Sequence, residues 1–267
     1  MDESAIKLIQ QTAVDADSDR MPSEFACRLV ALPDNYEVHD LEKYMSGRER
    51  FRGTYATQSI SDFVAYVKAR KGEGYIDADK HQAVVFFNLG TNDEPGHADH
   101  RAVLTLKPTA AFNAMLKADG AKADQRSTID WLEDWAGNLR AITQDGAEMA
   151  ASLAISAVRS VTVEAKKSSE HTQGDFNVAK STLEQVEASS RVGLPAGFEF
   201  TCEPYLGLPS RSFFLRLSVN TGGDKPMLAL RIVRREAQEE AIAQDFKRVL
   251  LNEVGEDAAL TIGTFTP

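Results

Sequence analysis

"HQAVVFFNLGTNDEPGHADHRAVLTLKP", residues 81–108, holds two short runs rich in Val, Leu and Phe that a polar loop joins. Short apolar runs bounded by turn residues are typical of strands. The loop is longer than two paired strands require. We therefore expect a β-hairpin with a long connection, and antiparallel pairing in the sheet that contains it.

Helices are predicted on both sides of this hairpin. Residues 57–74 predict a helix that Ser59 or Ser61 caps, with an apolar stripe of Phe63, Val64 and Val67, and that Gly72 and Gly74 end. Three more helical segments follow at 109–120, 127–146 and 147–161, the second with Ser127 and Asp130 in the pattern of a capping box.

The last third of the chain changes to strands. Three strand candidates cover residues 197–205, 211–219 and 225–233, and "NTGGDKP", 220–226, predicts a hairpin turn. An amphipathic helix at 234–255 and a final strand at 260–265 follow. This order lacks a regular βαβ alternation and predicts an α+β fold, a mostly antiparallel mixed sheet or sheets with flanking helices.

The domain organisation expected is an N-terminal helix and connector at 1–20, followed by a single α+β domain at 21–267. That domain could divide into two closely packed lobes, 21–145 and 146–267. Two early strands are expected within 25–33 and 35–45.

Composition restricts the classes of function. The formal net charge of −10 opposes the binding of duplex DNA, although a local basic patch could still bind nucleic acid. No apolar run approaches the roughly 20 residues that span a bilayer, and the N-terminus opens with acidic residues, so we expect a cytoplasmic protein without membrane contact. Only two cysteines are present, Cys27 and Cys202, which fits reduced thiols and excludes a cysteine-rich zinc module.

The hairpin loop is the first candidate functional site. It carries Asp93, His97, Asp99, His100 and Arg101. Imidazole and carboxylate groups suit zinc, iron or manganese, so a metal site on His97, Asp99 and His100 is one interpretation, with Asp93 or His81 as a further ligand. A polar turn explains most of these residues, and Pro95 and Gly96 oppose the helix that would align the two histidines. We favour the turn and expect no metal.

A second candidate site is "GRERFRGTY", 47–55, where Arg48, Arg50 and Arg52 alternate with Phe51 and Tyr55 nearby. In an extended segment the three arginines would face one way, and arginines with aromatic rings can hold a phosphate backbone and stack bases. A solvated edge strand is the alternative, because charge also discourages edge-to-edge pairing.

Other chemistry finds little support in the sequence. Glu133, Asp134 and Asn138 lie near Trp131 and Trp135, but this is the polar half expected of an amphipathic helix. The chain lacks GxxxxGK[ST], GxGxxG, HExxH and GxSxG motifs, so no cofactor is expected. Cys202 lies in an apolar strand and is interpreted as an inert buried thiol.

A resemblance extends from about Phe51 to Phe265. The stretches "FRGTYATQSISDFVAYV", "HADHRAVLTL", "WLEDWAGNL", "AVRSVTVEA", "PAGFEFTCEPYLGLPSRSFFLRLSV", "GDKPMLALRIV" and "IGTF" resemble, in this order, the YfdQ-like family of phage and prophage proteins, a domain of unknown function. The resemblance implies a phage context, often near recombination or nucleotide-metabolism genes, and it provides no catalytic residues to carry over to this chain.

The leading hypothesis is a non-enzymatic accessory protein of a phage or prophage that self-associates and binds a host or phage component. It would act in the cytoplasm of the bacterial host, on nucleic-acid metabolism or host defence. One alternative is a metal-dependent nucleotide or nucleic-acid hydrolase that uses the His97, Asp99 and His100 loop. Another is a module for single-stranded nucleic acid that uses Arg48, Arg50 and Arg52.

Overall fold

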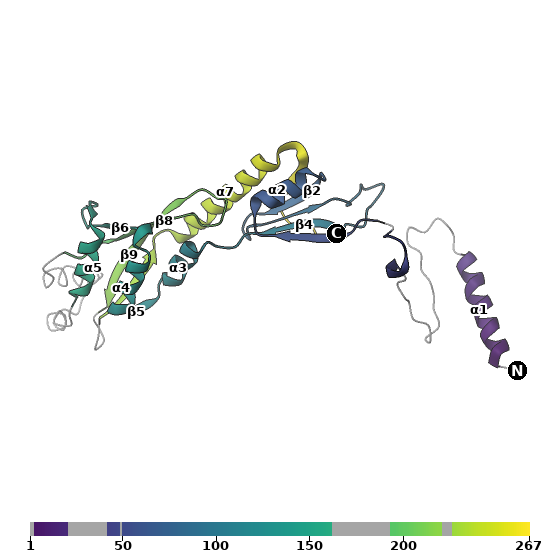
Figure 1. The fold of residues 1–267 in the computed structure, drawn as a ribbon, viewed down its shortest axis with the longest axis horizontal. Coiled ribbons are helices and arrows are strands. Elements are labelled where there is room, and N and C mark those ends of the chain that lie inside the picture. The colour runs from purple at the N-terminus through teal and green to yellow at the C-terminus, as the bar shows by residue number, and fades with distance from the viewer. Residues whose placement is uncertain (1–2, 21–41, 49, 162–192, 221–225) are drawn as a thin grey trace, which may run out of the picture. The chain divides into compact units, whose positions relative to one another are not determined.

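The computed structural model describes residues 3–20, 42–48, 50–161, 193–220 and 226–267 (Figure 1). The chain divides into two units, Met1–Phe51 and Arg52–Pro267. The first unit contains helix α1, Glu3–Arg20, and a short 3-10 helix η1, Glu42–Tyr44. Helix α1 therefore extends to the end of the range 1–20, in which a helix and a connector were expected. The strand expected at 25–33 lies outside the described residues, and η1 replaces the end of the one expected at 35–45.

A five-stranded sheet in the second unit has the order β1-β4-β3-β2-β11. Its strands are β1 (Gly53–Thr57), β2 (Gly72–Asp77), β3 (Gln82–Phe86), β4 (His100–Thr105) and β11 (Ala258–Ile262). The central pairs β2–β3 and β3–β4 are antiparallel, which confirms the predicted hairpin. The two outer pairs, β1–β4 and β11–β2, are parallel.

Helix α2, Ile60–Lys68, covers one face of this sheet. The Ser59 hydroxyl accepts a hydrogen bond from the backbone N–H of Asp62, and Phe63, Val64 and Val67 are buried, as predicted. The prediction that Gly72 and Gly74 end the helix is wrong, because the helix ends at Lys68 and both glycines lie in β2. A side chain at Gly74 would lie 2.7 Å from methyl groups on both neighbouring strands, so the sheet itself requires glycine there.

A six-stranded antiparallel sheet has the order β5-β10-β9-β8-β6-β7. The three strands predicted in the last third are confirmed as β8 (Gly197–Cys202), β9 (Arg211–Asn220) and β10 (Met227–Ile232). Strands β5 (Lys122–Asp124), β6 (Leu139–Ile142) and β7 (Glu148–Met149) complete the sheet. Most of the predicted turn at 220–226 lies outside the described residues.

Three helices accompany this second sheet: α3 (Ala110–Ala118), α4 (Gln125–Asp134) and α5 (Ala151–Arg159). The helix predicted over 127–146 is too long, because α4 is followed by 3-10 helix η2 (Ala136–Asn138) and then by β6. The predicted cap is also wrong. Asp124 caps α4, and its carboxylate accepts from the backbone N–H of Ser127 at 2.7 Å.

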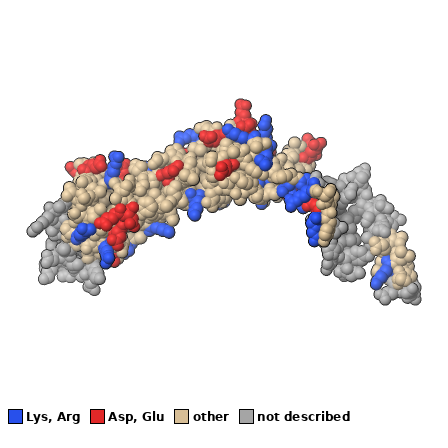
Figure 2. Space-filling view, viewed as in Figure 1, with Lys and Arg blue, Asp and Glu red and all other residues tan. Residues whose placement is uncertain are grey.

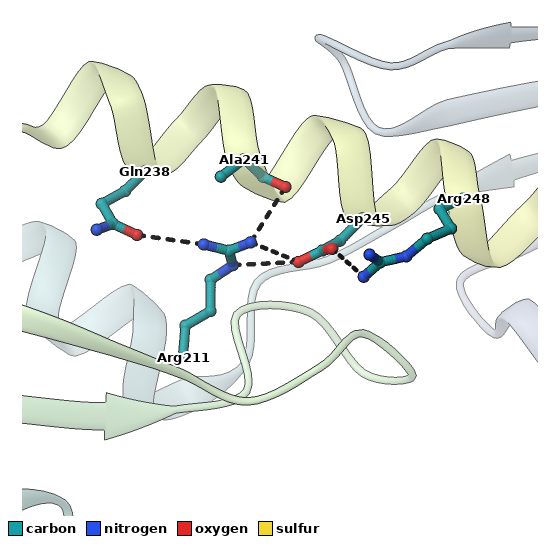
Figure 3. A network of polar contacts seen from close by, with 5 residues as sticks. All are labelled: Arg211, Gln238, Ala241, Asp245 and Arg248. Atoms are coloured by element: carbon teal, nitrogen blue, oxygen red, sulfur yellow. Dashed lines mark hydrogen bonds and ion pairs between the residues drawn. The ribbon is translucent and has the colours of Figure 1, made fainter.

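Helix α7, Arg235–Val254, contacts α2 and is anchored to β9, and the short 3-10 helix η5 (Gly255–Asp257) links it to β11. Its residues Ile242, Phe246 and Leu250 are buried, as the predicted apolar stripe requires. Figure 3 shows the polar anchor, in which the Arg211 guanidinium donates two hydrogen bonds to one carboxylate oxygen of Asp245, at 2.6 and 3.2 Å. The exposed Arg248 contacts the other oxygen.

Among the described residues, one hydrophobic cluster includes side chains from both sheets and from α7. The fold is therefore α+β, with helices flanking two sheets, as predicted. No described helix combines the length and the apolar character that a bilayer span requires.

Candidate functional site

The parallel pairing of β1 with β4 brings together two stretches that the sequence presented as separate candidate sites. Gly53 lies opposite His100, and Tyr55 lies opposite Ala102. The backbone N–H of Gly53 also donates to the carbonyl of Asp99 at 2.9 Å. Residues of the 47–55 and 93–101 stretches therefore meet at the β1 edge of the five-stranded sheet.

Three side chains form a layered stack at this edge. The rings of Tyr55, on β1, and Tyr66, on α2, are stacked with centroids 4.3 Å apart and planes within 12°. The guanidinium carbon of Arg70, just after α2, lies 3.6 Å from the centroid of the Tyr66 ring. Since both neighbours are too close to share one face, Tyr66 lies between them, an arrangement that combines aromatic stacking with a cation–π contact.

Two further rings extend the stack. The centroid of Phe87, which follows β3, lies 4.7 Å from that of His100 and 5.7 Å from that of Tyr66. The Tyr66 hydroxyl lies 3.4 Å from His100 Nε2. We call the five residues of this region the aromatic–arginine surface: Tyr55, Tyr66, Arg70, Phe87 and His100. Four of them are half-buried and Arg70 is exposed, so the surface is partly open to solvent.

The electrostatics of this surface favour the neutral form of His100. Burial lowers the pKa of its imidazole, the positive charge of Arg70 lowers that pKa further, and Asp99 opposes the shift. A neutral imidazole can stack, donate and accept a hydrogen bond. The surface therefore combines aromatic rings with the positive charge of Arg70.

Arg101 and Thr54 lie on the other face of the sheet. Side chains alternate along a strand, and β4 buries Ala102 and Leu104 on the face that His100 shares. Arg101 Nε donates to the Thr54 hydroxyl at 3.2 Å. Arg52 immediately precedes β1 and is half-buried.

The loop before β4 is organised by Asn88. Its side-chain amide donates to the Asp99 carboxylate at 2.8 Å, and its side-chain oxygen accepts from the backbone N–H of His100 at 3.0 Å. Its backbone carbonyl accepts from Ala98 N–H, and this carbonyl lies so close to Gly96 that a side chain there would approach it to 2.0 Å. This network explains why the loop contains Asn, Asp and Gly, and it gives His100 a defined position.

The other candidate residues of the loop do not join the aromatic–arginine surface. Asp93 and His97 are exposed. His81, considered as a further metal ligand, lies at the opposite end of β3 from this loop. Among the described residues, no group of three or more His, Cys, Asp or Glu side chains is arranged to hold a metal ion.

Arg48, Arg50 and Phe51 belong to the first unit. Arg48 and Phe51 are exposed and Arg50 is half-buried, and none of them lies in a strand. Within the second unit, only Arg52 and Tyr55 of this candidate set accompany β1.

Tyr66, Arg70 and Phe87 were not predicted as site residues. Tyr66 and Arg70 lie within residues 57–74, whose pattern predicts a helix. The signal available for Tyr66 and Arg70 was their spacing, because residues four apart in a helical turn lie on the same side.

The carboxylates beside the tryptophans are arranged as an amphipathic helix requires. Trp131 and Trp135 pack against Phe200, with ring centroids 5.8 and 6.2 Å away. Glu133 forms an exposed ion pair with Arg159, and Asp134 is exposed. Cys202 is buried, and burial raises the pKa of its thiol to about 11, so the thiolate is rare near neutral pH.

Positive and negative side chains are mixed on the surface. Figure 2 shows Lys and Arg interspersed with Asp and Glu on the face drawn. With a net charge of −10, binding of a polyanion would have to rest on local contacts.

Comparisons with known proteins give one match. A family model for uncharacterized conserved proteins matches residues 2–265. No curated protein and no solved structure matches the chain.

Proposed function

The chain belongs to the DUF2303 family of uncharacterized conserved proteins, and from this premise we propose that it is a non-enzymatic binding protein that holds single-stranded nucleic acid on its aromatic–arginine surface. The observation that carries the proposal is the layered stack of Tyr55, Tyr66 and Arg70 at the edge of the five-stranded sheet. Unstacked bases stack on aromatic side chains without sequence preference, and guanidinium groups add a cation–π contact and a phosphate partner.

Single strands fit this surface better than a duplex. A duplex hides the faces of its bases and is bound chiefly through phosphate charge, which a chain of net charge −10 opposes. A single strand exposes base faces, and each stacked base contributes about 1–3 kcal/mol. Stacking can therefore supply affinity where charge does not.

The biological setting is part of the proposal. The resemblance to the YfdQ-like family supports a phage or prophage origin, with action in the bacterial cytoplasm on nucleic-acid metabolism or host defence. Self-association is supported by the position of β1, since a strand at the edge of a sheet can pair with another chain.

Fluorescence anisotropy with a labelled oligothymidylate at low salt tests the binding. We expect Tyr55→Leu and Arg70→Gln each to weaken binding roughly tenfold, in line with the loss of one stacking or cation–π contact. The matched controls are Tyr75→Leu, a half-buried tyrosine at the other side of the same sheet, and Lys68→Gln, an exposed cation near Arg70.

No binding at low salt would overturn the proposal, and so would equal effects of the site variants and their controls. Circular dichroism of each variant shows that the fold is retained. Native mass spectrometry of the same preparations reports whether the chain self-associates.

A further inference from the structure

A concave site lies on the six-stranded sheet, where β9 and β10 meet the start of α7. It is a cavity of about 420 Å³. Four arginines line it, together with two acidic residues and the backbone after β10: Arg216, Arg231, Arg234, Arg235, Asp119, Glu236, Ile232 and Val233. Four positive charges and two negative charges thus face one cavity in a chain whose net charge is −10.

Arg216 and Arg231 lie directly opposite each other on antiparallel strands β9 and β10. Their side chains therefore leave the sheet on the same face, and like charges in this position destabilise a sheet. Both are exposed, and neither has an ion pair or hydrogen bond from its side chain to a described residue. The next strand has Gly197 opposite Arg216, so β8 places no carboxylate directly opposite the pair.

The two carboxylates of the cavity do not neutralise its four arginines. Asp119 accepts from the Ile232 backbone N–H at 2.8 Å with one oxygen and pairs with Arg235 at 3.1 Å with the other. Arg235 also pairs with Glu239 at 2.8 Å. These contacts fix Arg235 in place and leave Arg216, Arg231 and Arg234 against the single carboxylate of Glu236.

The backbone at this point adds donors to the guanidinium groups. Arg234 is in the left-handed region, with φ 54° and ψ 46°, and it occupies the N-cap of α7 without a side-chain cap hydrogen bond. The first N–H groups of a helix have no partner within the helix. An anion held by the arginines would also lie at the positive end of the helix dipole.

We propose that this cavity binds the phosphate group of a small organic phosphate, such as a nucleoside monophosphate. Guanidinium groups bind phosphate oxygens through paired hydrogen bonds, and several arginines around one cavity suit a dianion with three free oxygens. The volume lies within the range of small-molecule pockets, which leaves room for more than a bare phosphate ion. The site is on a different sheet from the aromatic–arginine surface and does not depend on the proposed function.

Isothermal titration calorimetry of the full chain with adenosine 5′-monophosphate, inorganic phosphate and adenosine tests this site. We expect the monophosphate to bind and adenosine not to bind. Arg216→Gln and Arg231→Gln should each weaken binding of the monophosphate about tenfold or more, as expected for loss of a charged hydrogen bond. Inorganic phosphate that binds as tightly as the monophosphate would support the phosphate site and identify the free ion as its ligand.

The matched control is Arg140→Gln. Arg140 is an exposed arginine on β6 of the same sheet, and it lies opposite Glu199 and outside the cavity. Arg216→Gln and Arg231→Gln also remove a repulsive pair, so the unliganded variants should melt at the same temperature as the parent or higher. Absence of monophosphate binding to the parent chain, unchanged binding in both variants, or equal binding of adenosine would overturn the proposal.

Discussion

His81, at the turn between β2 and β3, combines several features that are unfavourable for the free energy of folding. Its backbone is in the left-handed region at φ 51°, and its Nε2 is buried without a hydrogen-bond partner among the described residues. Its ring stacks on Tyr205 with centroids 4.4 Å apart and packs near Phe246. Burial lowers the pKa of this imidazole, and the nearby charges of Asp79, Glu239 and Asp77 oppose the shift.

The lowered pKa predicts a pH-dependent loss of stability. Between the pKa of folded His81 and about 6.5, the unfolded chain binds more protons than the folded one. The contribution of neutral His81 to the free energy of unfolding is therefore complete above about pH 6.5, and it is lost as the pH falls through the folded pKa. In His81→Phe we expect this pH dependence of the unfolding free energy to vanish. Because one ring replaces another, the variant should lose less than about 1.5 kcal/mol of unfolding free energy at pH 7.5.

Urea unfolding of the parent and His81→Phe between pH 7.5 and pH 5 measures this effect. The free energy of unfolding of the parent should fall relative to the variant as the pH decreases. His97→Gln, a change at an exposed histidine, serves as the control and should track the parent. A constant difference between parent and His81→Phe across the whole range would contradict the prediction.

At the scale of the elements, α7 depends on its polar anchor. Asp245 and Arg211 keep only 10% and 24% of their side-chain surfaces exposed, whereas Arg248 keeps 63%. Replacing Asp245 with Asn leaves the Arg211 charge in a mostly buried site without its partner. We expect this to cost about 3 kcal/mol of unfolding free energy.

Arg248→Gln is the matched comparison, because it removes the exposed partner of the same carboxylate and should cost at most about 1 kcal/mol. Thermal or urea unfolding of both variants gives the two values. Equal losses would mean that Arg211 and Arg248 contribute alike, against the burial seen in the structure.

Local patterns in the sequence predict some elements well and miss others for identifiable reasons. Strands β8, β9 and β10 and the β3–β4 hairpin have apolar residues and turn residues close together in the chain, so they were predicted correctly. Strand β6 was missed because its residues continue the helical pattern of α4. The parallel pairs β1–β4 and β11–β2 join distant segments, and parallel pairing has no short turn that marks it.

The candidate site was predictable only in part for the same reason. Tyr55 and His100 were singled out as separate candidates, but their proximity follows from the β1–β4 pairing and from the position of α2. Tyr66 and Phe87 were hidden in segments whose apolar pattern already explained them. The arrangement of a site made from four elements is set by tertiary packing.

At the scale of the whole molecule, the described hydrophobic core lies within residues 52–267. We expect a chain of these residues alone to fold, with a melting temperature within about 3 °C of the parent, which corresponds to a change of roughly 1 kcal/mol or less. Near-UV circular dichroism and calorimetry measure this.

A chain of residues 52–257 provides the comparison. It lacks β11, so it loses the buried Ala258 and the backbone hydrogen bonds to β2. This shorter chain should melt well below residues 52–267. If removal of the first unit lowers the melting temperature as much as removal of β11, the core does not have the boundary that the structure indicates.

The pairing of β11 with β2 also has a consequence for the timing of biosynthesis. All strands of the six-stranded sheet, and α7, lie between β2 and β11 in the chain. At roughly 5–20 residues per second, Ala258 leaves the ribosome on the order of ten to forty seconds after Asp77. During that interval the β2 edge of the nascent five-stranded sheet lacks its partner strand, and an unpaired strand edge is a place where chaperones bind and aggregation starts.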